Sequence, residues 1–441
     1  MVEIQDASGF RGQADRVFTP RDEAEAADLL RQANSTLTPV TIGGAWTGLT
    51  GGSVPDGGWV LDLRSMNSLA IGPGQAMTGP GTLLRDVQEA AAREKQIYGP
   101  DPTENTSSIG GNIANNSSGS RSFRYGDTRA NVRALRVALM DGRVLDVRRG
   151  DRIDFDVPAI PLPRTTKHSA GYRLFPGMDW VDLFVGSEGT LGVVTRAELK
   201  LLAAPRDVFS GVVFFDEDSR ALDAVDAWRG VERLNMLEYV DAHSLRVMEI
   251  DAAAALLIEQ EVSTGDEVDQ WLERLEAAGA LLETSWIATS DRDRERFRHF
   301  RHELPERVNA IVRQRGLLKL SSDFAVPVEN NRAMMACYRE LLDREFPGRY
   351  TIWGHIGDAH VHVNILPLDQ AEWDRARDAM LVFAKEAVRL GGVVGAEHGL
   401  GKRKAHFLAL QYTPSQIGAM KDVKRRMDPN WLLGRGNLFT D

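Results

Sequence analysis

The chain has 441 residues, of which 43% are hydrophobic and 26% are charged, a composition typical of a globular protein with enough apolar material for two cores. Its net charge of −10 provides no excess of positive charge to neutralise a nucleic acid or an anionic membrane surface. We therefore expect a small molecule, and no nucleic acid, as its partner.

The sequence gives no sign of membrane insertion or of disulfide chemistry. The first ten residues lack the basic and apolar blocks of a signal peptide, and the longest obvious apolar run, 252–258, is far shorter than the ~20 residues that span a bilayer. We expect a cytoplasmic protein with no transmembrane segment. Cys337 is the single cysteine, so the chain forms no intrachain disulfide and cannot by itself hold an iron–sulfur cluster, which needs several thiolates.

Hydrophobic periodicity and turn residues predict the following elements in chain order. The first part contains a helix over 21–34, a strand over 39–44, a short apolar run over 59–63 and a helix over 83–93. Residues 132–140 and 144–147 are predicted to be two strands joined by Asp141-Gly142, a strong hairpin signal. Beyond residue 202 we predict a strand over 208–215, helices over 219–229 and 266–278, a strand over 286–289 and a long charged helix over 291–315. Such alternation indicates a second α+β unit.

Three strings between residues 43 and 194 are rich in glycine. Residues 43–52 read Gly-Gly-Ala-Trp-Thr-Gly-Leu-Thr-Gly-Gly, residues 100–116 contain Ile-Gly-Gly-Asn-Ile-Ala-Asn-Asn, and residues 186–194 read Gly-Ser-Glu-Gly-Thr-Leu-Gly-Val-Val. Residues with little or no side chain let backbone N–H groups approach a phosphate closely. One such string alone is equally compatible with a surface loop, but three in succession indicate a cofactor with phosphates.

Two common phosphate-binding fingerprints are absent. The Gly-Pro-Gly strings at 72–74 and 79–81 lack the third glycine of G-x-G-x-x-G, and no string ends in the Gly-Lys-Ser/Thr of a Walker-A loop. A Rossmann NAD site and a P-loop are therefore disfavoured.

At these strings the chain resembles the FAD-binding oxidoreductases of the vanillyl-alcohol oxidase (PCMH) type, and within them the branch of D-lactate, D-2-hydroxyglutarate and glycolate dehydrogenases. The resemblance covers nearly the whole chain. It implies an α+β fold in which a PCMH-type FAD-binding domain, residues 1–204, is capped by an α+β substrate domain, residues 205–400. Residues 401–441 are expected to return to the FAD domain. Ala203-Ala204-Pro205 supports the first boundary.

The same resemblance implies which residues bind FAD. The expected residues are Gly44, Ala45, Trp46, Thr47, Gly48 and Leu49 at the pyrophosphate, Pro100, Asp101, Thr103, Gly110, Gly111, Asn112 and Asn115 in the central segment, Glu188, Gly192 and Val193 at the adenosine half, and Asn437 in the closing segment. Trp46 occupies a position where the family usually has glycine.

Histidines crowd the string Gly-His-Ile-Gly-Asp-Ala-His-Val-His-Val-Asn over 354–364. Strand alternation places His360 and His362 on one face, whereas His355 can join His362 only if Gly357-Asp358 bends the chain. Spacing alone does not decide between these pairs, and a strand with exposed histidines is the alternative. Glu397 and His398 stand together in a second glycine-rich string. Two histidines and one carboxylate are a usual composition of a catalytic metal site.

The histidine string resembles the family's His-x-Gly-Asp-x-x-x-His-x-Asn motif, and the second string resembles its Glu-His-Gly motif. The resemblance implies that His355, His362 and Glu397 bind a divalent metal, with zinc expected, and that His398 is the catalytic base. His360 stands where the family usually has asparagine, and its role is open.

These residue types suit the oxidation of an alcohol. A hydroxyl carbon can transfer hydride to the flavin N5 only as its oxygen loses a proton, and a divalent cation can lower the pKa of a bound oxygen ligand strongly, for water from about 15.7 to roughly 7. A neutral histidine can then accept the proton. We therefore expect a metal-assisted, FAD-dependent dehydrogenase that converts a D-2-hydroxy acid into the 2-oxo acid.

Three further residues are candidates for substrate binding. Arg301 resembles the family's substrate arginine and is also assigned to catalysis, because a guanidinium can grip a carboxylate with two hydrogen bonds. Many arginines crowd the same helix and most must face solvent. Lys319 and Asn364 are the other candidates, although relatives carry their lysine at the place of Ser321.

Two other interpretations remain open. Alkylglycerone-phosphate synthases share the fold without net oxidation, but they typically carry histidine where Glu397 stands. The chain could also be the flavoprotein subunit of a glycolate oxidase complex. Whether the chain acts alone as a dehydrogenase or as a subunit of an oxidase complex, we expect its electrons to pass to an acceptor other than NAD. Such an acceptor could be an electron-transfer flavoprotein, a quinone or an iron–sulfur partner subunit.

The glycine strings contain no histidine or cysteine at the place where some relatives attach the flavin, so we predict non-covalent FAD. Acid precipitation of the holoprotein should leave the yellow colour in the supernatant. A yellow pellet after washing would show a covalent bond.

Overall fold

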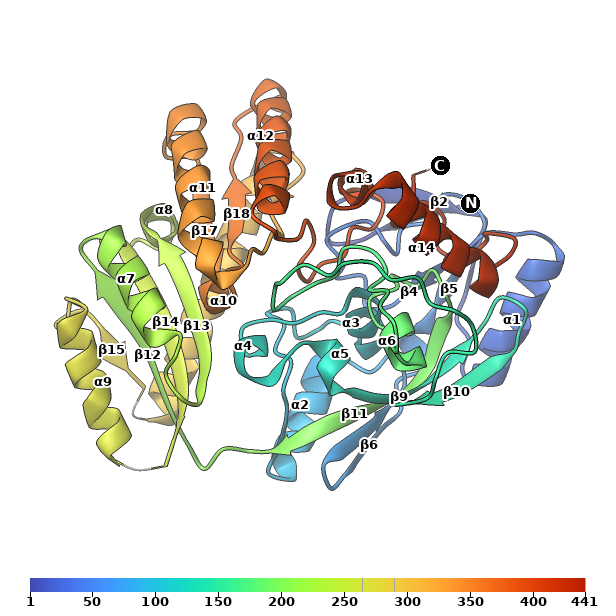
Figure 1. The fold of residues 1–441 in the computed structure, drawn as a ribbon, viewed down its shortest axis with the longest axis horizontal. Helices are drawn as coiled ribbons and strands as arrows, with labels where there is room; N and C mark the ends of the chain where they lie inside the picture. Colours follow the sequence, from blue (N-terminus) through green and yellow to red (C-terminus); the bar gives the residue numbers. More distant parts are fainter. Residues whose placement is uncertain (264, 289, 441) are drawn as a thin grey trace.

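The computed structural model describes residues 1–263, 265–288 and 290–440. Figure 1 shows two lobes side by side, one built from the two ends of the chain and the other from its middle. Strand β11 (Val193–Ala203) of the first lobe runs toward the connection between the two lobes. The mixture of helices and sheets confirms the expected α+β class.

The first lobe begins with a small parallel sheet in the order β3-β5-β4. Its strands are β3 (Arg16–Phe18), β4 (Val40–Gly43) and β5 (Trp59–Asp62). Helix α1 (Glu23–Ser35) connects β3 to β4, and the Asp22 side chain caps it by accepting the N–H of Glu25 at 2.9 Å. A short hairpin of β1 (Val2–Gln5) and β2 (Arg11–Ala14) precedes this sheet. The helix predicted over 21–34 and the strand predicted over 39–44 are thereby confirmed, and the apolar run over 59–63 contains β5.

A larger antiparallel sheet completes the first lobe in the order β10-β9-β11-β7-β6, with β8 paired to β11. Its strands are β6 (Leu69–Gly72), β7 (Gln75–Thr78), β8 (Gln96–Tyr98), β9 (Val132–Ala138), β10 (Val144–Arg148) and β11 (Val193–Ala203). The predicted β9–β10 hairpin is confirmed, and Gly142 at its turn has φ +82°. The helices of this part are α2 (Leu84–Arg93), α3 (Ile109–Asn115), α4 (Ser122–Tyr125), α5 (Thr128–Asn131) and α6 (Trp180–Phe184).

The second lobe is built on an antiparallel sheet in the order β15-β12-β14-β13-β17-β18-β16. Its strands are β12 (Asp207–Phe215), β13 (Leu234–Asp241), β14 (Ala254–Val262), β15 (Trp286–Ile287), β16 (Leu320–Ser321), β17 (Tyr350–Gly354) and β18 (His362–Ile365). The helices are α7 (Asp218–Trp228), α8 (Ala242–Val247), α9 (Gly265–Ala277), α10 (Asp291–Gln314), α11 (Asn331–Glu345) and α12 (Gln370–Arg389). The predicted elements of this lobe are present, although the strand expected over 286–289 ends at Ile287 and residue 289 lies outside the described residues.

The chain changes sheets between β11, which ends at Ala203, and β12, which begins at Asp207. This change falls at the boundary suggested by the sequence, and the division into domains stays a prediction. The C-terminal helices α13 (Leu408–Gln411) and α14 (Pro414–Met427) lie on the first lobe (Figure 1). Leu433 bridges to Val40 there, and the Asn437 side chain donates to the carbonyl of Gly52 at 2.8 Å.

Partly buried ion pairs join the lobes. Arg121 of the first lobe donates to both carboxylate oxygens of Glu259 in β14, at 2.8 and 2.9 Å. Arg301 of α10 donates to Asp101 of the first lobe at 3.1 Å. These contacts fix the second lobe over the glycine strings of the first.

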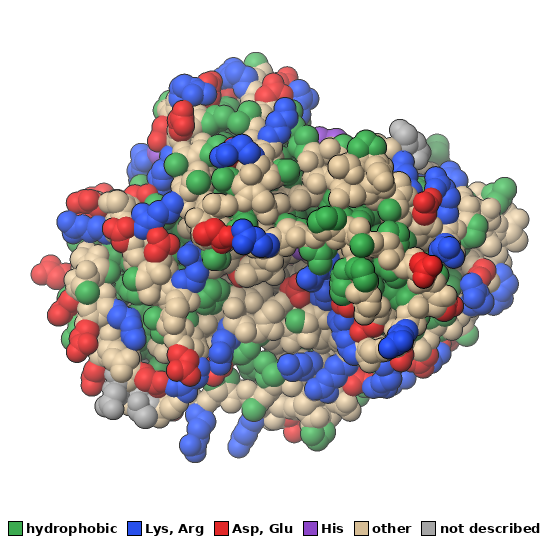
Figure 2. Space-filling view, viewed as in Figure 1, with side chains coloured by type: hydrophobic (Ala, Val, Ile, Leu, Met, Phe, Trp, Pro, Cys, Tyr) green, Lys and Arg blue, Asp and Glu red, His purple; other side chains and the backbone are tan. Residues whose placement is uncertain are grey.

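The outer surface shows no large region of one charge on the face in Figure 2, where acidic and basic side chains alternate. Among the helices of the described residues, none has the length and apolar character needed to cross a membrane.

Candidate active site

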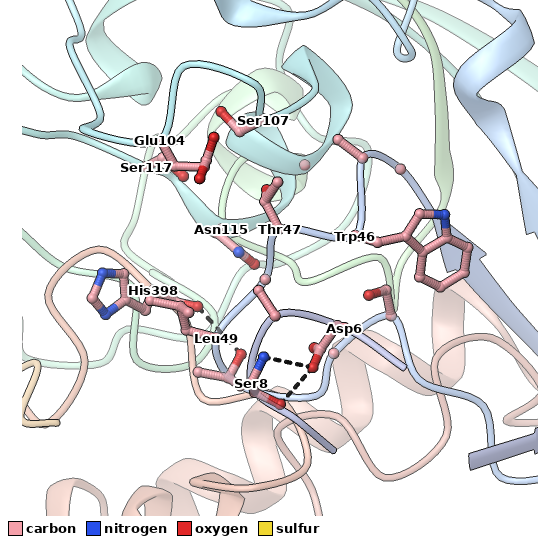
Figure 3. Close-up of a pocket in the computed structure, with 18 of the residues that line it drawn as sticks. Asp6, Ser8, Trp46, Thr47, Leu49, Glu104, Ser107, Asn115, Ser117 and His398 are labelled. Atoms are coloured by element: carbon pink, nitrogen blue, oxygen red, sulfur yellow. Dashed lines mark hydrogen bonds between the residues drawn. The ribbon is translucent and has the colours of Figure 1, made fainter. Parts of the chain in front are cut away.

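A cavity of about 680 Å³ lies where the glycine strings meet the second lobe. Figure 3 shows Trp46 at one side of it and His398 at the other, with Thr47 and Asn115 between them. The expected cofactor residues that line this cavity are Gly44, Ala45, Trp46, Thr47, Gly48, Leu49, Thr103, Gly110, Gly111, Asn112, Asn115, Glu188, Gly192, Val193 and Asn437. Pro100 is buried, and Asp101 faces Arg301. The FAD role of each residue stays a prediction.

The first two glycine strings are packed tightly together at Ser108. The Ser108 hydroxyl accepts the N–H of Ala45 at 3.3 Å, and a Cβ at Gly44 would lie 2.4 Å from the same oxygen. Glycine is therefore required at position 44 for this approach. Trp46 adopts φ +62°, the left-handed region that glycine favours, and its carbonyl accepts the N–H of Ala7 at 3.0 Å. The backbone at residue 46 thus has a conformation that glycine adopts most readily.

Glu188 holds the chain that follows His398. Its carboxylate accepts the N–H groups of Leu400 at 2.7 Å and Gly401 at 2.6 Å, and burial raises its pKa to about 7. A Cβ at Gly399, where φ is +71°, would lie 2.8 Å from the Glu188 carboxyl carbon. Glu188 therefore positions the segment 399–401, which follows Glu397 and His398, in addition to lining the cavity.

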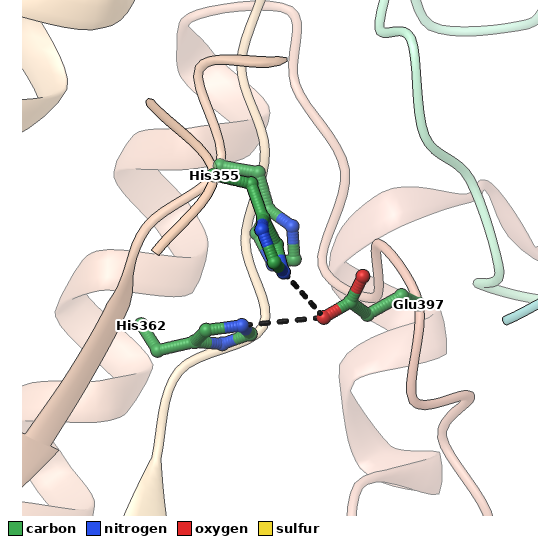
Figure 4. A group of neighbouring side chains, drawn as sticks. His355, His362 and Glu397 are labelled. Carbon is green, nitrogen blue, oxygen red and sulfur yellow. Dashed lines mark hydrogen bonds and ion pairs between the residues drawn. The ribbon is translucent and has the colours of Figure 1, made fainter. Parts of the chain in front are cut away.

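The histidine string folds back on itself. After β17 the chain makes a single turn over Ile356–Asp358, and Ala359 takes a left-handed φ of +49° before β18 begins at His362. This is the bend that His355 needs in order to face His362. Figure 4 shows both imidazoles directed at one oxygen of Glu397, with His355 Nε2 at 3.3 Å and His362 Nε2 at 3.2 Å from Oε1.

The remaining ring nitrogens of these histidines have acceptors of their own. His362 Nδ1 makes a hydrogen bond with the Ser322 carbonyl oxygen at 3.2 Å, whereas His355 Nδ1 lies at an ion-pair distance of 2.8 Å from Glu238 Oε1 without the alignment of a hydrogen bond. A proton on each Nδ1 faces an oxygen atom in this arrangement and leaves the two Nε2 lone pairs directed at Glu397. Three acceptor atoms then face one another without a proton between them, which is the arrangement that a cation stabilises.

The spacing of these atoms fits a divalent metal. Ligand bonds of about 2.0–2.1 Å in a tetrahedral site place neighbouring donor atoms roughly 3.4 Å apart. The observed separations from Glu397 Oε1 are 3.2 and 3.3 Å. The residues present therefore fit a metal, and His355, His362 and Glu397 are the ones that would hold it.

The other oxygen of Glu397 is held by the first lobe. Oε2 accepts the Ser118 hydroxyl at 2.7 Å, the N–H of Gly119 at 3.1 Å and the ammonium of Lys167 at 3.1 Å. Burial alone would raise the pKa of this carboxyl, but Lys167 and His355 hold it well below its ordinary value. Glu397 is consequently an oriented carboxylate with one free oxygen.

His398 lies beside this cluster and lines the cavity. Its Nε2 is 3.6 Å from Glu397 Oε1, and its Nδ1 is 3.5 Å from Asp323 Oδ1. Burial lowers the pKa of His398 to about 4, although Asp323 and Glu397 act to raise it. The ring is therefore neutral at pH 7 and able to accept a proton.

Asp323 organises the backbone around the base. It accepts the N–H groups of Ala396 at 3.1 Å and His398 at 2.9 Å, together with His360 Nε2 at 3.1 Å. His360 is fully buried and belongs to a set of His355, His360, His362 and Glu397 whose ligand atoms lie within 4.8 Å of one another. The structure thus brings His360 next to the cluster, and its contact with Asp323 is the one that the geometry shows.

The three candidate substrate residues lie in different surroundings. Arg301 is bonded to Glu238 at 2.9 Å and to Asp101 at 3.1 Å, so both of its partners are carboxylates of the protein. Asn364 is buried in β18 with its amide unpartnered among the described residues. Lys319 lines the cavity, and among the described residues no carboxylate lies within ion-pair distance of it. Burial and the neighbouring Lys404 lower the pKa of Lys319 to about 8.

Glu238, Asp323 and Lys167 were missed by the sequence interpretation. Each is a buried charged residue, and Glu238 stands in β13, whose eight residues are all buried. A charged residue at the centre of a strand whose immediate neighbours are apolar is the signal that could have indicated Glu238. Lys167 and Asp323 lie in irregular segments, where no such pattern exists.

The chain matches two family models in the order of its two lobes. Residues 14–148 match the model of the FAD binding domain, and residues 204–438 match that of the FAD linked oxidases, C-terminal domain. The protein belongs to the FAD-linked oxidases. It is accordingly an FAD-linked oxidoreductase, as the glycine strings indicated.

Named relatives match this FAD-linked oxidase over nearly its full length. It is 29% identical over 449 residues to a glycolate oxidase subunit GlcD of Bacillus subtilis (98% of this chain, 90% of the relative). It is 28% identical over 438 residues to a D-lactate dehydrogenase of Anaerostipes hadrus (94% and 87%), and 29% identical over 445 residues to a D-2-hydroxyglutarate dehydrogenase of Xanthomonas citri pv. viticola (96% and 89%). A solved alkyldihydroxyacetonephosphate synthase shares the fold, with a TM-score of 0.68 at 16% identity over 95% of this chain and 75% of that one.

The contact between Gly399 and Glu188 yields a prediction. Gly399→Ala should lower the free energy of unfolding by more than the about 1–2 kcal/mol that a left-handed residue costs, because the new methyl group also displaces the Glu188 carboxylate. Gly177→Ala is the matched control, since Gly177 has φ +81° with nothing within 4 Å of its added Cβ. Urea unfolding measures both, and equal losses would contradict the packing argument.

Proposed function

We propose that this FAD-linked oxidoreductase oxidises a D-2-hydroxy acid to the 2-oxo acid, with a divalent cation, expected to be zinc, held by His355, His362 and Glu397. The observation that carries the proposal is the convergence of these three side chains on one point beside His398, at the edge of the cavity. The names of the relatives, which refer to glycolate, D-lactate and D-2-hydroxyglutarate, support the substrate class.

Each group of the chain has a defined task in this reaction. When bound, FAD supplies a two-electron acceptor, and the cation supplies a Lewis acid that acidifies the substrate hydroxyl. His398 accepts the hydroxyl proton at Nε2, while Asp323 faces its Nδ1 and keeps the ring oriented. Lys319 offers an unpaired positive charge in the cavity for the substrate carboxylate. Arg301 and Asn364 remain proposed substrate residues, but Arg301 would have to leave a carboxylate partner to act directly.

The electrons must then pass to a second acceptor. We propose an acceptor other than NAD, such as an electron-transfer flavoprotein, a quinone or an iron–sulfur partner subunit. The chain carries one cysteine, so it cannot itself hold an iron–sulfur cluster. A role as a flavoprotein subunit is supported by the relative named as a glycolate oxidase subunit.

Anaerobic mixing with D-2-hydroxy acids tests the proposal. A competent dehydrogenase should bleach its flavin absorbance with the D enantiomer, and prior removal of the cation by a chelator should abolish bleaching until a divalent metal is restored. L enantiomers are the control. An oxidised spectrum with every hydroxy acid would point instead to a synthase-like reaction, and bleaching only with a partner protein would indicate an incomplete subunit.

His398→Ala tests the base. The variant should retain FAD and the cation but reduce its flavin at least about a hundredfold more slowly, because general-base catalysis contributes about 10²–10⁴ in rate. Stopped-flow absorbance of the flavin with saturating substrate measures the rate. Unchanged reduction would exclude His398 from proton transfer.

Lys319→Met tests the carboxylate contact. Loss of a charged hydrogen bond costs about 1.5–3 kcal/mol, so the substrate concentration for half-maximal flavin reduction should rise about tenfold or more. In the wild type this concentration should also rise as the pH increases through about 8, because Lys319 loses its charge there. Reduction assays from pH 6 to 9 measure both effects, and a wild-type pH dependence that persists in the variant would argue against Lys319.

A further inference from the structure

A chain of buried charges extends away from the cation site and crosses the lobe interface. It begins at His355 Nδ1, which lies 2.8 Å from Glu238 Oε1. The other carboxylate oxygen of Glu238 accepts Arg301 Nε at 2.9 Å, and Arg301 in turn donates to Asp101 at 3.1 Å. His355 is 3% exposed and Glu238 is 6% exposed, so water cannot replace these contacts.

Sheet pairing places Glu238 at this position. Strand β13 pairs antiparallel with β17, with Tyr239 opposite Gly354 and Val240 opposite Trp353. Glu238 in β13 and His355, directly after β17, are the residues next to the Tyr239–Gly354 pair. The pairing of β13 with β17 therefore brings them close together.

We infer that Glu238 is a positioning residue for the cation site and acts through His355. This inference rests on the proposed function. A carboxylate at Nδ1 retains the proton there, so the Nε2 lone pair is directed toward Glu397, and it makes the imidazole a stronger donor to a cation. Neither Glu238 nor Arg301 is among the described residues that line the large cavity, so neither needs to touch the substrate for this role.

Arg301 completes the arrangement by holding the second oxygen of Glu238. A carboxylate with only one partner could rotate away from His355, whereas the contact with Arg301 Nε restrains both oxygens. The same arginine reaches Asp101 in a glycine-rich string of the first lobe. The orientation of His355 is thereby connected to the docking of the two lobes.

Zinc affinity of the Glu238→Gln variant tests the inference. The amide preserves the shape of the side chain but removes its charge, and its NH₂ group would favour a proton on Nε2 of His355, where the cation must bind. We expect the FAD-loaded variant to bind Zn²⁺ about 10–100-fold more weakly than the wild type, with unchanged FAD content. Competition with a chromophoric chelator measures the affinity, and flavin absorbance measures the cofactor content.

Glu259→Gln is the matched control. Glu259 is also 6% exposed, lies in the neighbouring strand β14 and pairs with an arginine across the lobe interface. Its hydrogen bonds within the described part of the chain are with Arg121 and Asn235, neither of which belongs to the cation site. This variant should lose stability and keep the wild-type Zn²⁺ affinity. If Glu238→Gln binds Zn²⁺ as the wild type does, or if both variants weaken equally, the inference is wrong.

A second variant covers the case in which Glu238→Gln does not fold. Glu238→Asp keeps the charge near Arg301 but shortens the side chain by one methylene group, which removes the contact with His355. The Zn²⁺ affinity of this variant should also fall, and an affinity equal to that of the wild type would overturn the inference.

The same measurements separate the inference from the proposed function. Failure of the wild-type protein to bind Zn²⁺ would overturn the inference together with the proposed cation site. Normal binding in the Glu238 variants, with cation-dependent flavin bleaching, would leave the proposed function intact.

Discussion

The carboxylate of Glu397 is the contact on which the active-site arrangement depends. One of its oxygens accepts three donors from the first lobe, Ser118, Gly119 and Lys167, while the other faces two imidazoles of the second lobe. Neither lobe alone can orient this group, because each supplies contacts to only one oxygen. The docking of the lobes therefore creates both the cavity and the directed oxygen at its edge. The lobe interface also contains bidentate pairs such as Arg121 with Glu259, which fix an orientation as well as a distance.

The buried charges around Glu397 are each paired, which offsets the cost of removing them from water. Lys167 lies 3.1 Å from Glu397 and 3.6 Å from Asp358, and all three are nearly inaccessible to solvent. Asp323 accepts backbone N–H groups and is also stabilised by the positive charge of Lys404, and the ring of His398 beside it remains neutral. The oxygen of Glu397 that faces the two Nε2 lone pairs is different, since no donor of the chain satisfies it once the Nδ1 atoms carry the protons. A divalent cation would complete the charge pairing at that point.

Local patterns predicted most elements, and they also located the site. The Asp141-Gly142 hairpin and the helices over 23–35 and 84–93 follow from turn chemistry and periodicity, which are local. The bend between His355 and His362 could only be stated as a requirement, because strand alternation alone placed the two residues on opposite faces. The partners of the site were not predictable, since Glu238 meets His355 through the register of two strands more than 100 residues apart in the chain. The substrate role expected for Arg301 was drawn from its motif, and the motif holds no information about Glu238 and Asp101, which occupy its guanidinium in the structure.

His360, which stands where the family's histidine motif usually has asparagine, is accommodated in this site by a contact with Asp323. Burial lowers the pKa of its ring to about 3, so the ring is neutral and carries a single proton. The contact of Nε2 with Asp323 at 3.1 Å places that proton on Nε2, and Nδ1 is then a buried lone pair without a partner among the described residues. One oxygen of Asp323, Oδ2, already accepts the backbone N–H groups of Ala396 and His398. His360 provides a donor to the other oxygen, Oδ1. The imidazole therefore restrains Asp323, which in turn faces Nδ1 of His398, and it does so without adding a charge to the point where His355, His362 and Glu397 converge.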